Sequence, residues 1–397
     1  MKNKFLTNFK QAALGAAVCL ITMASCDSDN NTERPSSFTL NREDLRGTIT
    51  DGEVVLSSGT YKLTGKLEVS NGATLTIEPG VIIEATDVTT AQQEIRYIAV
   101  GQGAKINVKG TATNPVVMTA TKKSAGAWGG LVICGKAPIN KGQTATAEVS
   151  ELTYGGTDAN DNSGSVRYLR LEYTGYSFNE EKEFNGLSMF GVGKGTTIEY
   201  VQAYEGSDDG FEWFGGTVDS RYLVVVNKST QGSSFVADDM FDWTEGWNGT
   251  GEFWFGWKTN DGNRGIEADN NSVNHKATPI SNPTLRNLTL VGNRGGSTED
   301  QAVKMRVGTN GNLDNVVIAN WATGFDIQHD EGIAFINDGS LKATNVRFVN
   351  VGTKVKGSST AGAAVDIAKM VTENANAVGA GNGVDQPDWA KGWTVGF

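Results

Sequence analysis

Residues 285–290 read Leu-Arg-Asn-Leu-Thr-Leu, and this Leu-x-Asn-apolar-x-apolar phrase returns in related form at 313–318 and 343–348. Segments 166–171 and 198–203 are variants with tyrosine in the asparagine position. Neighbouring copies begin about 28 to 32 residues apart. This spacing is typical of one coil of a right-handed parallel β-helix, because each coil carries two or three short strands and buries its inward face on its neighbours. Asparagines at one position are then expected to stack as a ladder.

The rest of the chain carries the pattern of short strands. From residue 54 onward, apolar residues alternate at period two between turns such as Asn71-Gly72 and Pro79-Gly80. The blades of a β-propeller also repeat, but the short and uneven repeats here favour the solenoid. We predict an all-β, single-domain right-handed parallel β-helix over residues 46–374. The one helix is expected at 360–374, and residues 375–397 are expected to close the last coil as a cap.

The N-terminus predicts export. Lysines precede an apolar run at 12–21 that is too short to span a bilayer, and Met23-Ala24-Ser25-Cys26 resembles a lipobox. We predict that residues 1–25 are a cleaved signal peptide, that Cys26 is lipidated, and that residues 26–45 form a flexible tether. The alternative is a plain secretion signal with an incidental cysteine.

The net charge and the cysteine content disfavour some binding partners and exclude disulfides. The formal net charge is −11, and loss of residues 1–25, which hold three lysines and no acid, brings it to −14. Nucleic-acid binding is disfavoured because phosphates would be repelled. Of the three cysteines, Cys19 leaves with the signal and Cys26 is acylated, so no disulfide can form within the mature chain. Cys134 lies in an apolar segment and is predicted to be a buried thiol.

The strongest repeat lies in the middle of the chain. Residues 208–216 read Asp-Asp-Gly-Phe-Glu-Trp-Phe-Gly-Gly, and 238–246 read Asp-Asp-Met-Phe-Asp-Trp-Thr-Glu-Gly. A fainter third copy is found at 264–270. If these are equivalent strands, one set of apolar side chains stacks inside, namely Phe211, Phe241 and Ile266. The alternating positions then form an outward column of Glu212, Asp242 and Glu267, continued by Lys304 and Asp326.

These phrases resemble a known group of proteins. Together with Trp128-Gly129-Gly130-Leu131 and the closing residues 393–397, they look like a family of largely uncharacterised Bacteroidota outer-membrane lipoproteins with predicted β-helix folds. The resemblance covers roughly residues 46–397. It implies the fold and a place on the outer membrane, and the acidic stretch after Cys26 resembles the signals that send such lipoproteins to the cell surface. It implies no catalytic residue.

The acidic column needs neutralisation, because strands on neighbouring coils lie only about 4.8 Å apart. One alternative is Ca²⁺, which takes about six to eight oxygen ligands. The candidate metal ligands are Asp208, Asp209, Asp238 and Asp239, with help from Glu212, Asp242 and Glu267. The other alternative is internal pairing with Arg264, Lys304 and Arg306.

The leading functional hypothesis is a non-enzymatic, ligand-binding surface lipoprotein that works alongside an outer-membrane transporter. Its ligand would be a glycan, because exposed aromatic rings stack on sugars and flanking polar groups bind hydroxyls. The candidate binding residues are Trp213, Trp243, Trp247, Trp254, Glu267, Asp269 and Asn270. The alternative for the rings is that they fill a wide solenoid core.

An enzyme is the second hypothesis, as a Ca²⁺-dependent polysaccharide lyase or a glycoside hydrolase. Paired carboxyls for hydrolysis would be Asp209 with Asp239, or Glu212 with Asp242. In a lyase, Lys304 or Arg306 would take the proton. The only histidines, His275 and His329, lie far apart in polar stretches and are expected to be separate surface residues. A purely structural or adhesive solenoid is the third hypothesis.

Overall fold

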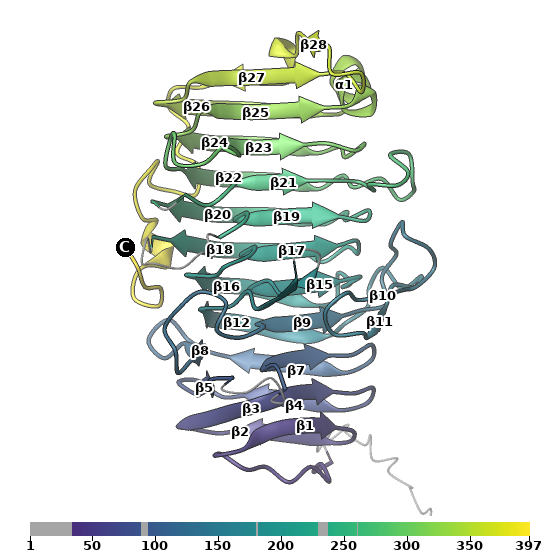
Figure 1. Ribbon diagram of the computed structural model, residues 1–397, viewed down its shortest axis with the longest axis vertical. Helices are drawn as coiled ribbons and strands as arrows, with labels where there is room; N and C mark the ends of the chain where they lie inside the picture. The colour runs from purple at the N-terminus through teal and green to yellow at the C-terminus, as the bar shows by residue number, and fades with distance from the viewer. Residues whose placement is uncertain (1–33, 89–93, 180–181, 229–236, 260) are drawn as a thin grey trace, which may run out of the picture. The chain divides into compact units, whose positions relative to one another are not determined.

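The computed structural model describes residues 34–88, 94–179, 182–228, 237–259 and 261–397 (Figure 1). Residues 34–397 form one compact unit around a 25-stranded sheet whose strands pair in parallel, apart from β27 with β28. This confirms the all-β solenoid prediction. Residues 1–25 and Cys26 lie outside the described residues. No helix within the described ranges is long and apolar enough to cross a membrane.

The first coils of the β-helix have three strands each. Their strands are β1 (Leu45–Ile49), β2 (Glu53–Leu56), β3 (Thr60–Val69), β4 (Thr74–Ile77), β5 (Ile82–Ala85), β6 (Tyr97–Val100), β7 (Lys105–Lys109) and β8 (Val116–Ala120). Residues 34–45, the last part of the predicted tether, lie against the first coil, where Pro35 bridges Glu53 and Asp51 accepts hydrogen bonds from Ser37. Residues 34–45 therefore belong to the same structured unit as the first coil.

From β12 on, each coil has one short and one long strand (Figure 1). The short-strand stack contains β9 (Leu131–Cys134), β15 (Leu187–Phe190), β17 (Phe211–Phe214), β19 (Phe241–Thr244), β21 (Ile266–Ala268), β23 (Gln301–Met305), β25 (Thr323–Gln328) and β27 (Thr353–Ser358). The long-strand stack contains β12 (Gly164–Glu172), β16 (Thr197–Tyr204), β18 (Ser220–Asn227), β20 (Thr250–Lys258), β22 (Thr284–Val291), β24 (Asn312–Ala319), β26 (Lys342–Val349) and finally β29 (Val371–Glu373). Two hairpins interrupt the coils, β10 (Ala145–Thr146) with β11 (Thr153–Tyr154), and β13 (Ser177–Asn179) with β14 (Lys182–Glu183).

The repeated asparagine or tyrosine marks a bend in each long strand. β12 pairs with β7 before Tyr168 and with β8 after it, so this position joins two strands that are separate in the first coils. All equivalent residues have φ between 49° and 60°, namely Tyr168, Tyr200, Tyr222, Phe253, Asn287, Asn315 and Asn345. The rings of Tyr168 and Tyr200 stack with centroids 4.3 Å apart, and Asn315 Nδ2 donates to Asn287 Oδ1 at 2.8 Å. The predicted asparagine ladder is confirmed.

Replacing Asn315 by alanine should destabilise the fold by about 1–2 kcal/mol. Alanine has no side chain that stabilises the left-handed conformation, which costs an ordinary residue about that much. Asn315→Gly should cost less because glycine adopts this conformation freely. Urea unfolding of both variants, with Asn312→Ala on the same strand as a control, measures the difference. Equal losses for the alanine and glycine variants would contradict the backbone explanation.

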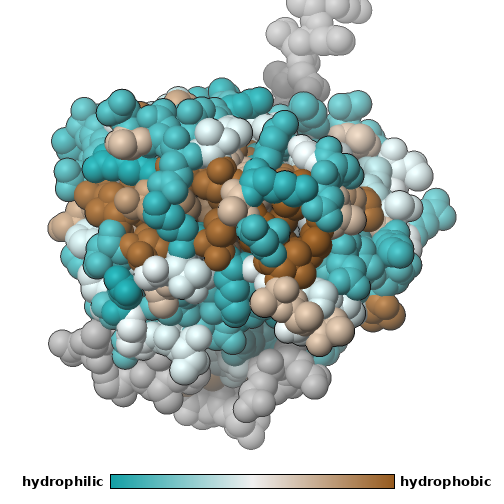
Figure 2. Space-filling view, turned by 90° about the horizontal axis from the view of Figure 1, so that it is seen from above, coloured by the Kyte–Doolittle hydropathy of each residue, from teal (hydrophilic) through white to brown (hydrophobic). Residues whose placement is uncertain are grey.

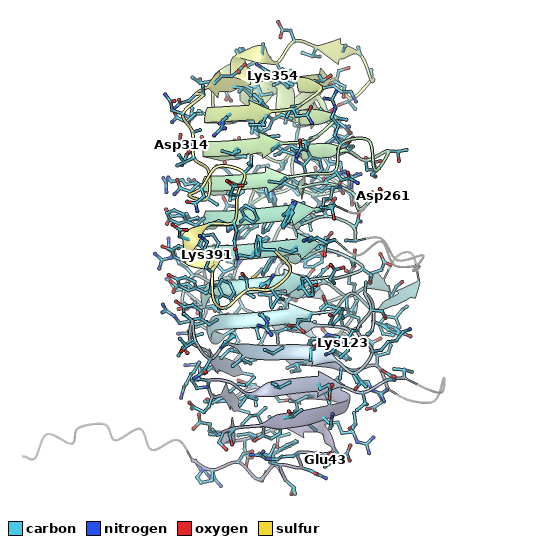
Figure 3. The ribbon with its side chains drawn as sticks, turned by 90° about the vertical axis from the view of Figure 1, so that its left-hand side faces the viewer. Glu43, Lys123, Asp261, Asp314, Lys354 and Lys391 are labelled. Carbon is cyan, nitrogen blue, oxygen red and sulfur yellow. The ribbon has the colours of Figure 1, made fainter. Side chains whose placement is uncertain are left out.

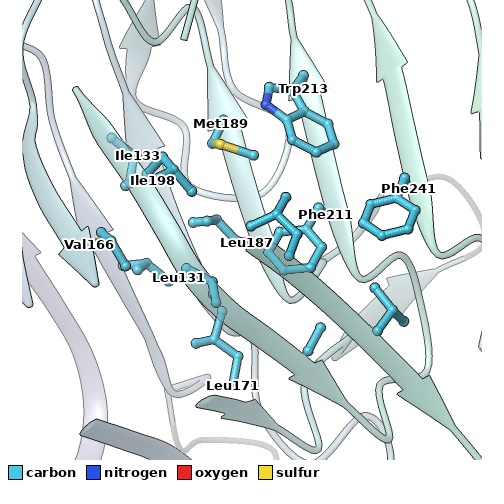
Figure 4. Packing of buried hydrophobic residues seen from close by; sticks show 14 of the residues in the cluster. Leu131, Ile133, Val166, Leu171, Leu187, Met189, Ile198, Phe211, Trp213 and Phe241 are labelled. Atoms are coloured by element: carbon cyan, nitrogen blue, oxygen red, sulfur yellow. The ribbon is translucent and has the colours of Figure 1, made fainter. Parts of the chain in front are cut away.

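Inward side chains of the short-strand stack form continuous rows. Leu131, Leu187, Phe211 and Phe241 lie opposite one another on successive coils, and Figure 4 shows this row packing in the interior. The Cys134 thiol is fully buried, and burial raises its pKa to about 12. The prediction of an inert core thiol is confirmed, since a protonated and enclosed sulfur is a poor nucleophile.

The predicted helix at 360–374 was wrong. This segment forms β28 (Ala364–Val365), the 3₁₀ turn η1 (Ala368–Met370) and β29, because pairing with β27 and β26 overrides helix propensity. The only α-helix in the described part of the chain is α1 (Asp330–Asp338), with two acids in its first turn and Gly339 as a left-handed C-cap. Both signals are readable in the sequence and were missed.

The C-terminal segment does not close the last coil, which corrects the predicted cap at 375–397. It runs back over the outer side of the long-strand stack, where Figure 3 shows the segment with Lys391 far from Lys354 in the last coils. It contains the 3₁₀ turn η2 (Asp388–Ala390), and Trp393 packs edge-on against Tyr168. Gln202 is hydrogen-bonded to both the N–H and the carbonyl of Val395. The end of the solenoid itself exposes apolar side chains (Figure 2).

Candidate functional site

The outward side chains of the short-strand stack form the predicted column. Glu212 of β17 lies opposite Asp242 of β19, and Asp242 lies opposite Glu267 of β21. Lys304 and Asp326 follow on the next two coils. The predicted order of charges along this face is confirmed, because the thirty-residue repeat keeps equivalent residues on equivalent strands.

The part of the column on β21 and β23 is neutralised by the chain's own cations. Arg264 Nη1 lies 3.0 Å from Glu267 Oε1 and 3.2 Å from Asp239 Oδ2. Arg306 contacts the other oxygen of Glu267, and Lys304 Nζ lies 3.8 Å from Oε1. Burial alone would lower the pKa of the Arg264 guanidinium, but Asp239 and Glu267 raise it above its usual value. Internal pairing, one of the two predicted alternatives, therefore explains this part of the column.

The part of the column on β17 and β19, together with the aspartates just before these strands, has no such counter-charge. Asp209, Glu212 and Asp242 each offer a carboxylate oxygen, and these oxygens lie within 4.8 Å of one another. Asp209 also belongs to a second group of this kind, with Asp208 and Asp238. We call these five residues the acidic cluster. Among the described residues no ion pair joins them to a cation, the charges that act most strongly on Asp209 and Asp242 are all acids, and Oδ1 of Asp242 is buried without a hydrogen-bond partner there.

Burial and crowding perturb the acidic cluster strongly. Burial raises the pKa of Asp209 well above its usual value, and the carboxylates of Asp208 and Asp242 raise it further. Burial also raises the pKa of Asp242, with further contributions from Glu212 and Glu267. Carboxyl groups in this situation either keep a proton or require a cation. The three carboxylates of each group can supply several of the oxygen ligands that Ca²⁺ prefers.

The long-strand stack shows how the same fold pairs charges elsewhere. Arg167, Glu199, Arg221, Glu252 and Arg286 occupy equivalent outward positions on successive coils. Arg167 Nη2 lies 2.7 Å from Glu199 Oε2, and Arg286 Nη1 lies 3.5 Å from Glu252 Oε1. Acids and arginines alternate in this column. The run of acids on the short-strand stack therefore does not serve to hold neighbouring coils together.

Two insertions border the acidic cluster. In residues 137–157, which carry β10 and β11, Tyr154 Oη donates to Glu245 Oε2 at 2.5 Å. Burial raises the pKa of Glu148 in the same insertion to about 7. The other insertion carries the hairpin of β13 and β14. Just after it, Asn185 Nδ2 donates to Glu212. By excluding water from the cluster, the two insertions would strengthen its attraction for a cation.

The four tryptophans predicted to bind sugars lie in the core. Trp213, Trp243, Trp247 and Trp254 are 0% exposed. Trp213 stacks on Trp247 and Trp254 with centroids 4.7 and 4.9 Å apart. These rings cannot stack on a glycan, which corrects the binding prediction and supports the alternative of a wide aromatic core. Sequence alternation on β20 did not show which of its rings faces inward.

The remaining predicted binding residues are engaged within the protein. Glu267 is held by three cations, and Asp269 Oδ1 accepts a hydrogen bond from Arg306 Nε at 2.8 Å. Asn270 is 0% exposed and organises its own loop by donating to the carbonyls of His275 and Ala277. The structure thus corrects the role of Asn270, which supports the site and cannot contact a ligand.

A pocket of about 360 Å³ opens next to the column, between the 137–157 insertion and the loop after β21. Its lining residues are Asn140, Lys141, Thr244, Glu245, Asn271, Ser272, Val273, Asn274 and Ala277. Lys141 Nζ lies 3.0 Å from Glu245 Oε1, and Thr244 follows Asp242 on the outward face of β19. Amides, hydroxyls and an ion pair suit a hydroxyl-rich ligand. Sequence reasoning missed these residues because most lie in insertions outside the repeat.

Several of the predicted catalytic groups are engaged in ion pairs within the protein. Asp239 is paired with Arg264, so the predicted pair of Asp209 with Asp239 lacks a second free carboxyl group. Lys304 Nζ lies 3.3 Å from Glu299 Oε2 as well as near Glu267. Burial alone would lower the pKa of Arg306, but its acidic neighbours raise it, which makes this guanidinium a poor base.

The two histidines lie together, contrary to the prediction of separate surface residues. The ring centroids of His275 and His329 are 4.8 Å apart, and His275 Nδ1 lies 3.3 Å from Glu331 Oε2. The loop after β21 and the end of β25 bring them together from coils two steps apart, on either side of the coil of β23. Their separation in the sequence gave no sign of this contact.

Comparison with known proteins identifies the family of this chain. The family model described as pectate-lyase-like β-helix domain matches residues 47–394. The chain belongs to this family. Neither the curated proteins nor the solved structures include a significant match. The pectate-lyase-like domain thus spans both stacks, the acidic cluster and the histidine pair.

Proposed function

We propose that this protein is a surface lipoprotein, anchored to the outer membrane through lipid on Cys26, that binds a glycan with the help of Ca²⁺. The observation that carries the proposal is the acidic cluster, whose carboxylates lack counter-charge although the fold pairs acids with arginines elsewhere. Asp209, Glu212 and Asp242 would hold one ion. Asp208 and Asp238, with the shared carboxylate of Asp209, offer further oxygen ligands beside it.

The chemistry of the site favours a glycan that carries carboxylates. The mature chain would have a net charge of −14, so it would repel a polyanion unless a cation lay between them. Ca²⁺ can bind protein and uronate carboxylates at the same time. The adjacent pocket supplies amides and hydroxyls for sugar hydroxyl groups. Membership of the pectate-lyase-like family supports a carbohydrate ligand.

Asp242→Asn should weaken Ca²⁺ binding by about 10- to 100-fold, because it removes a charged ligand from the centre of the cluster. Calorimetric titration of the metal-free protein with CaCl₂ measures the change. Glu252→Gln is the matched control, since Glu252 occupies an outward position on the long-strand stack beside Arg286. The control should bind Ca²⁺ as the wild type does.

The glycan is tested separately. Wild-type protein should be retarded on immobilised polygalacturonate in CaCl₂ and released by a chelator, whereas Asp242→Asn should not be retained. Retention that is equal with and without Ca²⁺ would contradict the bridging role. Absence of Ca²⁺ binding by the wild type would contradict the proposal as a whole.

A polysaccharide lyase is the second candidate, favoured by the pectate-lyase-like family and by a side chain of Arg306 that is one-third exposed beside the column. A binding protein leaves its ligand intact, whereas a lyase shortens it and leaves an unsaturated sugar end. Ultraviolet absorbance of the products distinguishes these two functions.

A further inference from the structure

The C-terminal segment is fastened along the outer side of the long-strand stack. We call residues 375–397, seen around Lys391 in Figure 3, the strap. Near its start, the N–H of Gly379 donates to Asn315 of β24 at 3.2 Å, and near its end Trp393 packs edge-on against Tyr168 of β12. β12 and β24 are five pairing steps apart, or about 24 Å along the axis. The strap therefore ties together coils that are too far apart to contact one another directly.

The coils are shaped to receive the strap. One row of outward positions on successive long strands consists of Gln202, Val224, Phe255, Thr289 and Val317. All five are at most 1% exposed, although outward residues on the surface of a solenoid normally meet water. Val224 and Phe255 share an apolar cluster with Trp393 of the strap. The row is therefore buried because the strap covers it.

Two polar side chains of this row bind the backbone of the strap. Gln202 Nε2 donates to the carbonyl of Val395 at 2.8 Å, and Gln202 Oε1 accepts the N–H of the same residue at 2.9 Å. The hydroxyl of Thr289 donates to the carbonyl of Gly383 at 2.9 Å and accepts the N–H of Ala380 at 3.0 Å. Buried amides and hydroxyls are stable only when they are hydrogen-bonded. The sequence of the coils thus specifies the path of the strap.

A glycine lets the strap approach the coils closely. Gly379 has φ 57°, and a Cβ atom there would collide with Thr289 Oγ1 and lie 2.6 Å from the carbonyl oxygen of Leu288. The backbone of Leu288 cannot give way without disturbing β22, so a side chain at position 379 would lift the strap. Gly362, outside the strap, also has a positive φ of 80°, but a Cβ atom there would have nothing within 4 Å.

The strap has to dock after the coils that it crosses. Gln202 and Val395 are 193 residues apart in the sequence, so their contact costs a large loop-closure entropy unless the coils between them are already stacked. The buried row exists only once the long strands lie side by side. Residues 375–397 also follow every coil in chain order, so synthesis delivers them after all the coils. Docking of the strap is then the final step of assembly.

We propose that the strap is a kinetic lock, which closes last and must detach before the coils from β12 to β24 can unfold. Coils of a solenoid contact only their neighbours, so unfolding can begin at one end and spread coil by coil. The strap blocks this route, because a strand that leaves the stack must also break its contacts with the strap. The inference goes beyond the proposed function, since neither the cation nor the glycan takes part. In a protein that lies outside the cell, as proposed above, slow unfolding limits attack by proteases.

Trp393→Ala in the full chain should release the lock. The ring of Trp393 is 0% exposed and packs on both Tyr168 and Tyr200. We expect the unfolding rate in urea to rise by about 100-fold or more, because contacts that form after the folding transition state act on unfolding. The refolding rate should change by less than about twofold. Rapid mixing with urea, followed by tryptophan fluorescence, measures both rates.

Gly379→Ala is a milder variant, and it decides the question if Trp393→Ala does not fold. Gly362→Ala is its matched control, because both substitutions place alanine at a positive φ but only the one at position 379 meets Thr289. Gly379→Ala should unfold about tenfold faster than Gly362→Ala. Hydrogen exchange should show the amides of the strap opening before those of β16 to β22 in the wild type, and faster exchange of these strands in Gly379→Ala.

Two results would overturn the lock. If Trp393→Ala refolds slowly but unfolds at the wild-type rate, the strap docks early and helps the coils to form. If Gly379→Ala and Gly362→Ala unfold at the same rate, detachment of the strap does not limit unfolding. Neither measurement involves Ca²⁺ or a glycan, so the lock and the proposed binding function stand or fall separately.

Discussion

Trp254→Ala is expected to destabilise the β-helix by about 3–5 kcal/mol, the usual cost of removing a fully buried large ring. Trp254 is 0% exposed and stacks on both Trp213 and Phe241, with centroids 4.9 and 4.7 Å apart. Its removal leaves a cavity among the stacked rings of the aromatic core, which neighbouring strands cannot close without breaking their pairing. Urea unfolding of the two proteins measures the loss.

Trp257→Ala is the matched control, because Trp257 lies on the outer side of the same strand. Its half-buried ring contacts Lys228 Nζ at 4.3 Å and packs on Phe397. We expect a loss of about 1 kcal/mol from this contact. At temperatures where both variants are folded, Ca²⁺ and glycan binding should match the wild type. Loss of glycan binding by a stable Trp254→Ala variant would restore the ring as a ligand contact.

The fold and the charge column could be predicted because they depend on periodicity alone. A repeat of thirty residues places Glu212 and Asp242 on equivalent strands, and alternation at period two puts both on one face. The inward position of Phe211 and Phe241 follows from the same two periods. No knowledge of loop structure is needed for either conclusion.

Periodicity could not predict which of these side chains are free to contact a ligand. Alternation separates the two faces of β20, but it does not show that the C-terminal segment covers the outer face and packs Phe397 against Phe255. Nor does it show that Arg264, which precedes β21, turns back to neutralise Asp239 and Glu267. Both results depend on loops and termini whose paths the repeat does not fix.

The site also depends on residues that belong to no repeat. Asn140 and Lys141 reach the pocket from an insertion, and Asn140 Nδ2 donates to Asn270 Oδ1 at 2.8 Å. The approach of His275 to His329 follows from the loop after β21 lying next to the end of β25. Insertions on one edge of regular coils thus supply the chemistry, whereas the coils supply the acidic column beneath them.

The acidic cluster makes the stability of the metal-free protein depend strongly on pH. The folded-state pKa values of Asp209, Glu212 and Asp242 are raised well above their usual values by burial and by the neighbouring carboxylates. In the unfolded chain these groups titrate near pH 4. Between the two values the folded state binds more protons than the unfolded state, so stability falls as the pH rises.

In a chelating buffer, we therefore expect the free energy of unfolding to fall as the pH rises from about 4 through the neutral range, at about 1.4 kcal/mol for each unit by which a folded-state pKa is raised. Saturating Ca²⁺ should reverse the trend, because it binds the ionised cluster of the folded state and adds about 2.7 kcal/mol at a hundred times its Kd. Asp242→Asn should be more stable than the wild type at the upper end of this range without metal, and should gain much less from Ca²⁺. Glu252→Gln, which removes an acid already paired with Arg286, should leave the slope unchanged. Urea unfolding at each pH measures these differences, and a metal-free stability that is flat or rising over this range would mean that the carboxylates are neutralised by groups other than a bound cation.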